Sequence, residues 1–353
     1  MKNDLMRINT NLTNGKEREI WADYVKVIAI YLMVLCHFNL NSEIGKQFIW
    51  IFHMPVFFLI SGYFDKGLPF SMDILKKNFR TLIIPYFFFS VCNLTICWVS
   101  PYLHPEYYHN GTILQSFGKA VLGMFLMDDV VRPYAFMPCL AVWFLAALFE
   151  IKITFAFLVT CWQKCKILII PILLLIVILV YWHFPFFSID SAGLGLVFYF
   201  VGFLFKKFSL CKLINNYSAW LLFILIFAYL WFVGMKNGII NIDGGEWGNS
   251  VIMFYINGVV GSICCIALSK VITIDIPFVA EIGRSTLSIL GTHAFIGIVG
   301  KTFCVTLLHY SPRDFPIMAS VFLSIIALIF GVYVHRFLYK YYPIAIGQIK
   351  RNQ

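Results

Sequence analysis

The chain has 353 residues, of which 61% are hydrophobic and 12% are charged, and its mean hydropathy is +0.84. Soluble domains are about 45–50% apolar and about 25% charged, so this composition excludes a soluble protein and indicates an integral membrane protein. The net charge of +10 does not indicate nucleic-acid binding, because the basic residues recur in the loops between apolar segments, as membrane topology requires.

A membrane-spanning helix needs about 20 mainly apolar residues. By this criterion the sequence predicts an all-α polytopic membrane protein with about ten transmembrane helices. The segments that begin at residues 46, 166 and 191 are short or interrupted by Pro or Gly, so the number is fixed only to within one. In chain order the predicted spans are residues 21–40, 46–64, 79–99, 139–160, 166–183, 191–206, 218–235, 249–269, 285–307 and 315–337.

The loops between these spans alternate in their content of basic residues. The poor loops contain Lys46, Lys119, Arg132, Lys236 and Arg313. The rich segments contain Lys2, Arg7, Lys16, Arg18, Lys66, Lys76, Lys77, Arg80, Lys164, Lys166, Lys206, Lys207, Lys212, Lys270, Arg336, Lys340, Lys350 and Arg351. Basic loops face the cytoplasm, so both termini are predicted to be cytoplasmic. We therefore expect a tail over residues 1–20, a single transmembrane domain over 21–340 and a second tail over 341–353. No small-residue cleavage site follows the first apolar segment, so we expect an uncleaved first span.

The first predicted span, WADYVKVIAIYLMVLCHFNL, carries Asp23, Lys26 and His37. An ionisable group at membrane depth costs about 2.5–3.5 kcal/mol on insertion scales, which makes it a candidate for function. Lys26 and His37 are eleven residues apart, so they share one helix face and lie roughly 16 Å apart along the axis. This pattern indicates a polar stripe with a cation near one end and an imidazole well inside. The alternative is that both side chains hydrogen-bond to neighbouring helices.

The second span, FIWIFHMPVFFLISGYF, carries a second imidazole, His53, together with a helix-breaking Pro55. Gly62, between Ser61 and Tyr63, permits the close approach of another backbone. The pattern favours a kinked packing helix, and His53 adds a candidate polar contact.

The segment KKNFRTLIIPY follows and places Lys77 and Arg80 three residues apart, on one face of a helix at the cytoplasmic edge. Fixed cations at this depth suit phosphate groups, and Arg suits them best because its planar fork binds two oxygens. The alternatives are plain positive-inside topology or contact with anionic lipid headgroups.

Later segments carry further polar groups. The run IGRSTLSILGTHAF places Arg284 at the cytoplasmic edge and His293 nine residues deeper, facing nearly the opposite way. His293 faces either a cavity or the core, and Lys301 lies close to its face. Glu150 and Lys152 are expected to pair with each other. The long connection over 100–138 contains Tyr102, His104, Tyr107, Tyr108 and His109, which suit either a sugar or the aromatic belt, and its apolar part, 117–127, suits a re-entrant or interfacial helix.

The ten cysteines lie mostly within apolar spans. Cys161 and Cys165, and the neighbours Cys264 and Cys265, do not form a paired CxxC pattern. We expect neither a disulfide framework nor a metal site.

Five of these stretches together resemble the acyltransferase-3 family of bacterial membrane O-acyltransferases, and in particular its fucose 4-O-acetylase-like branch. The first is Asp23-x-x-Lys26 with His37, which matches an R/K-x10-H pattern. The others are FHMPVFFLISGY (52–63), Lys77-x-x-Arg80 with Pro85, WFLAALF (143–149) and the IGRSTLSILGTH run. The chain departs from the commoner pattern in having Lys at 26, and Leu148 stands where some branches have an acidic residue.

The resemblance implies transfer of an acyl group, usually acetyl from cytoplasmic acetyl-CoA, to a hydroxyl of a cell-surface polysaccharide or its lipid-linked precursor, in a bacterial inner membrane. It implies three groups of site residues and no metal. Catalysis is assigned to His37, Lys26 and Asp23, and the CoA phosphates to Lys77, Arg80 and Arg284. The acceptor is assigned to His53, Ser61, Tyr63, Trp143 and His293.

His37 would act as a general base or as an acyl carrier, and the sequence does not choose between them. The alternative function is a secondary transporter that uses intramembrane histidines as a proton relay. The acceptor sugar and any homo-oligomer stay open.

Overall fold

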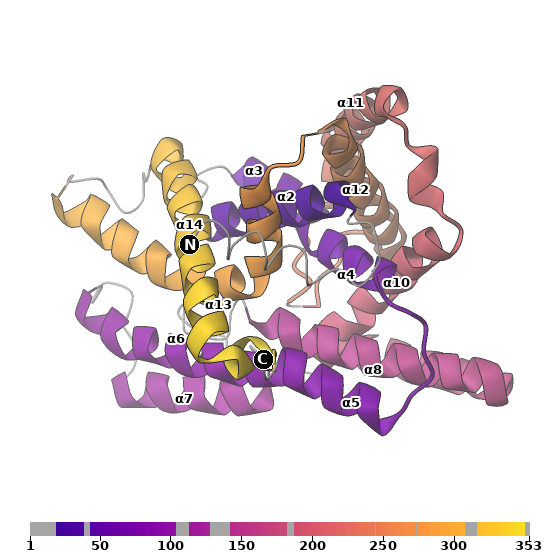
Figure 1. The fold of residues 1–353 in the computed structure, drawn as a ribbon, viewed down its shortest axis with the longest axis horizontal. Coiled ribbons are helices and arrows are strands. Elements are labelled where there is room, and N and C mark those ends of the chain that lie inside the picture. The colour runs from indigo at the N-terminus through magenta and orange to yellow at the C-terminus, as the bar shows by residue number, and fades with distance from the viewer. Residues whose placement is uncertain are drawn as a thin grey trace.

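The computed structural model describes residues 19–38, 43–103, 113–127, 142–181, 187–243, 245–272, 274–307 and 316–349, and over these ranges it is helical, with no β-strand (Figure 1). The α-helices are α2 (Ile20–His37), α3 (Glu43–Trp50), α4 (His53–Tyr63), α5 (Met72–Asn78), α6 (Ile84–Leu103), α7 (Ile113–Leu126), α8 (Trp143–Lys164), α9 (Ile169–Tyr181), α10 (Ile189–Lys207), α11 (Asn216–Phe232), α12 (Val251–Val271), α13 (Pro277–Leu307) and α14 (Ile317–Tyr341). Five short pieces join them: the π-helical turn η1 (Phe79–Ile83) and the 3₁₀ turns η3 (Lys166–Leu168), η4 (Leu210–Leu213), η5 (Gly234–Asn237) and η6 (Pro343–Ile346).

Within the described residues, eight segments are long and apolar enough to cross a membrane: Ile20–His37, Glu43–Tyr63, Trp143–Lys164, Ile189–Lys207, Ser218–Asn237, Val251–Val271, Pro277–Cys304 and Ile317–Tyr341. The all-α polytopic fold is confirmed. The other two predicted spans contain α6 and α9, and α9, with 13 residues, is shorter than a full crossing requires. The largest boundary error is at α13, which begins at Pro277 instead of residue 285.

The second span is divided into α3 and α4 at Ile51–Phe52. Pro55 has no backbone N–H, and a helix tolerates such a residue only in its first turn. It is the third residue of α4, so the helix restarts just before it. The kink expected from Pro55 is therefore a complete break, and His53 begins the new helix.

The third span contains a π-helical turn. Helices α5, η1 and α6 follow one another without interruption, and the backbone N–H of Ile84 donates to the carbonyl of Phe79, five residues back. This wider turn precedes Pro85, whose ring would collide with the carbonyl of Thr81 in a regular α-helix. Lys77 lies before this turn and Arg80 lies inside it, and their placement on one helix face stays a prediction.

Helices α4 and α10 cross at two glycines. A Cβ atom added to Gly62 would lie 1.9 Å from the carbonyl oxygen of Tyr199, and one added to Gly202 would lie 1.9 Å from the carbonyl oxygen of Leu59. Only a residue without a side chain permits this approach, in the manner of small-residue contacts between membrane helices. The close contact expected of Gly62 is confirmed.

Helices α2, α13 and α14 form the part of the bundle that carries His37 and His293 (Figure 1). Helices α2 and α13 run in the same direction, since Gly283 lies against Asp23 and Gly297 lies against the ring of Phe38. Helix α14 runs the opposite way, with Arg336 paired to Glu281 near the start of α13. The starts of α2 and α13 thus share one end of the molecule.

The same end gathers residues from helices far apart in the sequence. Glu19 accepts hydrogen bonds from Tyr63 at the end of α4 (2.8 Å) and from Lys206 at the end of α10 (2.5 Å). Lys270, at the end of α12, lies over the ring of Trp21 at 5.9 Å. These positions all belong to segments that the charge bias assigns to the cytoplasm, so the packing agrees with the alternation of loops predicted from the sequence.

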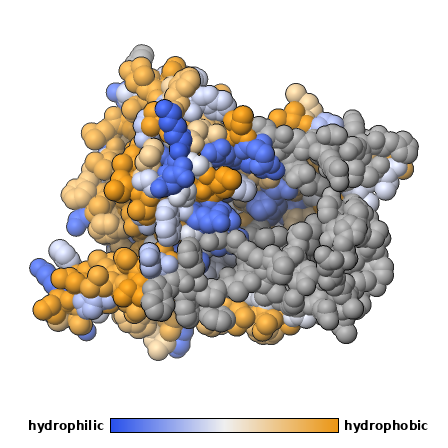
Figure 2. Space-filling model, turned by 180° about the vertical axis from the view of Figure 1, so that it is seen from behind, coloured by the Kyte–Doolittle hydropathy of each residue, from blue (hydrophilic) through white to orange (hydrophobic). Residues whose placement is uncertain are grey.

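The surface of the molecule is rich in exposed apolar side chains, as expected of helices that face lipid. Figure 2 shows the face opposite to Figure 1, where hydrophilic residues gather near the middle of the described surface and hydrophobic residues lie beside them. Among the eight candidate spans the one formed by α11 is the most exposed.

Candidate active site

Two histidines from different helices meet where α2 ends. The centroids of the His37 and His293 rings are 5.1 Å apart and their planes are tilted by 56°. His37 is the last residue of α2 and its side chain is exposed, whereas His293 is 1% exposed. The imidazole of His37 therefore lies at the end of its helix and not well inside it, which corrects the sequence-based placement. One ring is accessible and its neighbour is buried.

The backbone beside His37 is held by two helices. Phe38 is 1% exposed, and its ring lies 6.4 Å from that of His293 and against Gly297 of α13. The carbonyl oxygen of Phe38 accepts a 2.8 Å hydrogen bond from the hydroxyl of Ser320 in α14. The C-terminal end of α2, which would otherwise fray, is thereby fixed, and His37 is presented from a rigid base.

The buried ring of His293 has a defined hydrogen-bond pattern. Its Nδ1 lies 2.9 Å from the carbonyl oxygen of Leu290 and 3.3 Å from that of Ile289. Carbonyl oxygens only accept, so Nδ1 carries a proton and donates it. In the neutral ring Nε2 is then an acceptor.

Lys26 and Asp23 lie near the opposite end of α2 and pair with each other at 3.7 Å. The ammonium group of Lys26 also lies 5.3 Å from the centroid of the Phe64 ring. The eleven-residue separation places Lys26 about 16 Å along the axis from His37, so this structure does not bring the two predicted catalytic groups into contact.

Arg80 has a buried nitrogen without a hydrogen-bond partner. Its Nε is one of two such buried side-chain atoms in the described residues, and the other is the hydroxyl of Ser285. The backbone of the π-turn is covered by Gly347, whose added Cβ would lie 2.5 Å from the Cα of Thr81 and 3.0 Å from the carbonyl oxygen of Arg80. A buried guanidinium donor without an acceptor costs free energy, so the unpaired Nε of Arg80 is an exception to the usual pairing of buried polar groups.

A second polar cluster follows α4 directly. Asp65 accepts a 2.5 Å hydrogen bond from the hydroxyl of Tyr199, and Lys152 lies 3.2 Å from that hydroxyl and 3.7 Å from Asp65. The positive charge of Lys77 also repels that of Lys152. The expected pair between Glu150 and Lys152 is wrong, because neighbouring positions on a helix point in different directions. The sequence placed Asp65 in a loop and gave no signal of this contact.

The Asp65 cluster makes a stability prediction. Replacement of Asp65 by Asn leaves Lys152 largely buried without a counter-charge, and we expect it to lower the free energy of unfolding by about 3 kcal/mol. Thermal unfolding in detergent measures the loss. The double variant Asp65→Asn with Lys152→Met removes both charges and should recover most of it. No recovery would show that the ion pair is not the source of the effect.

The remaining predicted acceptor residues do not join the two histidines. His53 is 9% exposed and its Nδ1 donates to the carbonyl of Ile49 at 3.1 Å, while Trp143, 7% exposed, packs edge-on against Phe144. Both act as core residues here. Tyr63 is committed to Glu19 and Lys206, and Ser61 is half-buried.

Helix α13 carries more polar groups than the sequence analysis used. Arg284 is exposed and lies two turns inside the helix. The hydroxyl of Ser288 lies 3.1 Å from Nδ1 of His335 in α14, and both Glu281 and Arg284 act electrostatically on that histidine. Glu281, Arg284 and Ser288 are spaced three and four residues apart, as on one face of a helix. This spacing could have predicted a polar face on α13 from the sequence.

Cys211 lies at the same end of the molecule as Glu19. Burial raises the pKa of its thiol to about 11, although Lys270 acts in the opposite direction. The thiol is therefore protonated at neutral pH and does not supply a nucleophile.

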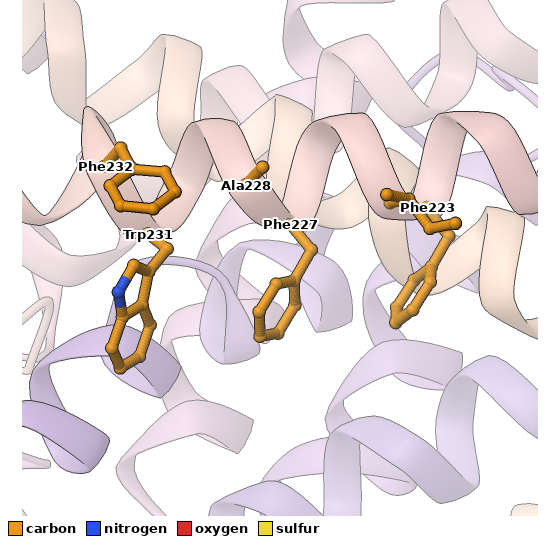
Figure 3. Close-up of a pocket in the computed structure, with 6 residues that line it drawn as sticks. Phe223, Phe227, Ala228, Trp231 and Phe232 are labelled. Atoms are coloured by element: carbon orange, nitrogen blue, oxygen red, sulfur yellow. The ribbon is translucent and has the colours of Figure 1, made fainter.

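An apolar groove runs along α11, where Phe223, Phe227 and Trp231 project from the same side of the helix (Figure 3). Its volume is about 420 Å³. None of the described residues that line the groove has a titratable side chain, so among them there is no acid, base or nucleophile.

Some predicted positions lie outside the described residues or their side chains. These are His104, Tyr107, Tyr108 and His109, and the side chains of Tyr102 and Lys301. The apolar part of the same connection forms α7, which packs against α6, and the hydroxyl of Tyr86 donates to the carbonyl of Met124 at 3.0 Å.

The profile of the acyltransferase-3 family, described as an acyltransferase domain, matches residues 19–337, which include both histidines and Arg80. The chain belongs to this family. It is a multi-pass membrane acyltransferase. The resemblance to this family seen in the sequence is confirmed, and the assignment to its fucose 4-O-acetylase-like branch stays a prediction. No protein of curated function and no solved structure matches the chain.

Proposed function

We propose that this acyltransferase moves an acetyl group from cytoplasmic acetyl-CoA to a hydroxyl of a cell-surface polysaccharide or its lipid-linked precursor, in a bacterial inner membrane. The observation that carries the proposal is the exposed imidazole of His37 held against His293 at the end of α2. A sugar hydroxyl is a weak nucleophile, and an imidazole is the side chain best suited to take its proton near neutral pH.

The donor is proposed to bind at the end of the molecule that carries Lys77 and Arg80. Arg80 supplies a buried unpaired donor, and Lys77 is exposed nearby, so together they suit the phosphates of CoA. Arg284, also exposed, lies toward the same end because Gly283 adjoins Asp23 near the start of α2. The flexible arm of CoA would then extend along α2, past Lys26, toward His37.

The chemistry follows in one of two ways. In direct transfer, His37 removes the proton of the sugar hydroxyl while the hydroxyl oxygen attacks the thioester carbonyl. The C–S bond then breaks, and the proton passes from His37 to the CoA thiolate. In the stepwise route, a nitrogen of His37 attacks the thioester carbonyl first, the C–S bond breaks, and the CoA thiolate takes up the proton that the acetylated imidazole loses. The sugar hydroxyl then attacks the acetyl-imidazole, the C–N bond breaks, and the hydroxyl proton passes to the departing imidazole. Both routes need the exposed face of His37.

Donor binding is tested at the π-turn. Acetyl-CoA should raise the melting temperature of the purified protein, since a ligand that binds only the folded state stabilises it. Replacement of Arg80 by Gln should abolish most of that rise, because it removes the unpaired guanidinium. The matched control is Lys76→Gln, which removes an exposed cation one residue before Lys77. Equal stabilisation of all three proteins would contradict donor binding at Arg80.

The acceptor is tested in cells. Deletion of the gene should remove the mass of one acetyl group from a surface glycan, as seen by mass spectrometry, and the wild-type gene should restore it. Restoration by a His37→Ala gene would exclude His37 from the reaction, and an unchanged glycan profile would exclude a surface polysaccharide as the acceptor.

A further inference from the structure

We propose that His293 is a positioning residue for His37: its unprotonated Nε2 accepts a hydrogen bond from the ring of His37 and thereby turns the opposite nitrogen of His37 toward the substrate hydroxyl. The inference rests on the proposed role of His37 and assigns the buried imidazole a task different from binding the acceptor.

The first support is contact. The two ring centroids are 5.1 Å apart with the planes tilted by 56°, and the ring of Phe38 is 6.4 Å from that of His293. One buried imidazole thus touches two successive residues at the end of α2. Because Gly297 and Ser320 hold Phe38 from two sides, the position of His37 relative to His293 is set by packing and not by His37 alone.

The second support is the tautomer of His293. Its Nδ1 proton is used by the carbonyls of Leu290 and Ile289 in its own helix. The free lone pair is therefore on Nε2, and this ring can accept but not donate on that side. A catalytic histidine needs one ring nitrogen to hold a proton and the other to be free, and a fixed acceptor beside it selects that arrangement.

The third support is burial. His293 is 1% exposed, so a carboxylate in its place would be a buried charge with a large desolvation penalty. A neutral imidazole performs the same orienting task without that penalty. When His37 takes up a proton, the ring that lies against it, with its centroid 5.1 Å away, would offer Nε2 as the acceptor for the charged ring. The arrangement has the logic of a base oriented by a third group, with an imidazole as that group.

The test compares three substitutions of His293 that separate the acceptor at Nε2, the donor at Nδ1 and the packing of the ring. His293→Gln places a side-chain carbonyl where Nε2 lies, His293→Asn keeps a donor near Leu290 but loses the distal acceptor, and His293→Phe keeps only the ring. With acetyl-CoA and membranes that contain the acceptor, kcat should fall about 10–100-fold in the Asn and Phe proteins, by analogy with other orienting partners, while KM for acetyl-CoA stays unchanged. The Gln protein should retain most of the wild-type kcat.

A spectroscopic measurement tests the same idea without turnover. In protein labelled with ¹⁵N-histidine, the signals of His37, assigned by their loss in His37→Ala, should report one tautomer in the wild-type and Gln proteins and a mixture in the Asn and Phe proteins. Identical His37 signals in the wild-type and Phe proteins, or a Gln protein as impaired as the Phe protein, would overturn the inference. Failure of the wild-type protein to transfer acetyl would instead refute the proposed function, and the tautomer result would still stand.

Discussion

Replacement of His37 by Ala should lower acetyl transfer by at least about 100-fold, the lower end of what a positioned acid or base contributes, while the protein remains folded. The loss is expected because both proposed routes use the imidazole. The fold is expected to survive because the side chain of His37 is exposed at the end of α2, so its removal leaves no cavity in the core. Acetylated glycan formed per folded molecule, with the melting temperature measured in parallel, gives the result.

The matched control is His53→Gln. Like His37, His53 is a histidine at a helix terminus, because it is the first residue of α4. Unlike His37, it is only 9% exposed, and its ring is hydrogen-bonded to the carbonyl of Ile49. Its replacement should lower the melting temperature and leave the rate per folded molecule nearly unchanged. A His37→Ala protein with normal turnover would show that the exposed imidazole is not part of the reaction, whatever the result for His53.

The sequence predicted the elements of this site better than their arrangement. Runs of about 20 apolar residues locate membrane helices because lipid requires every backbone polar group to be satisfied within the helix. The helical repeat also placed Arg284 and His293 on different faces, and Arg284 is exposed whereas His293 is buried. These features depend on local spacing alone.

Contacts between helices could not be predicted from local spacing. No spacing rule joins His37 to His293, or Asp65 to Lys152, because these pairs depend on which helices are neighbours. The π-turn before Pro85 also escaped prediction. One wider turn changes the helical register of the residues that follow it.

The polar stripe predicted for the first span needs a similar correction. Lys26 and His37 share a stripe but stand about 16 Å apart, and each has a nearer neighbour, Asp23 for the lysine and His293 for the imidazole. The stripe is therefore better understood as a path with two ends. Under the proposed function, the phosphates of the donor would bind toward the end near Lys26 and transfer would occur at the end near His37, so the length of α2 would set how far the acyl donor must extend.

The two-glycine crossing of α4 and α10 should be the position where a small change does the most damage to the fold. Gly62→Ala places a Cβ 1.9 Å from the carbonyl oxygen of Tyr199, and that oxygen belongs to a helix backbone that cannot rotate away. The two helices must separate, and the tightly packed surroundings must follow. We expect a loss of about 3 kcal/mol or more, at the upper end of the range for overpacking, measured as a lower melting temperature and lower yield.

Gly118→Ala is the matched control, because it makes the same substitution within a helix, α7, where an added Cβ meets no atom within 4 Å. There the change should be neutral or stabilising by up to about 1 kcal/mol, since Ala favours a helix more than Gly does. A Gly62→Ala protein as stable as Gly118→Ala would mean that α4 and α10 do not approach this closely. The consequence would reach the Asp65 cluster, because Asp65 follows α4 directly and Tyr199 belongs to α10. The same crossing that buries Gly62 holds the hydroxyl of Tyr199 within 2.5 Å of Asp65.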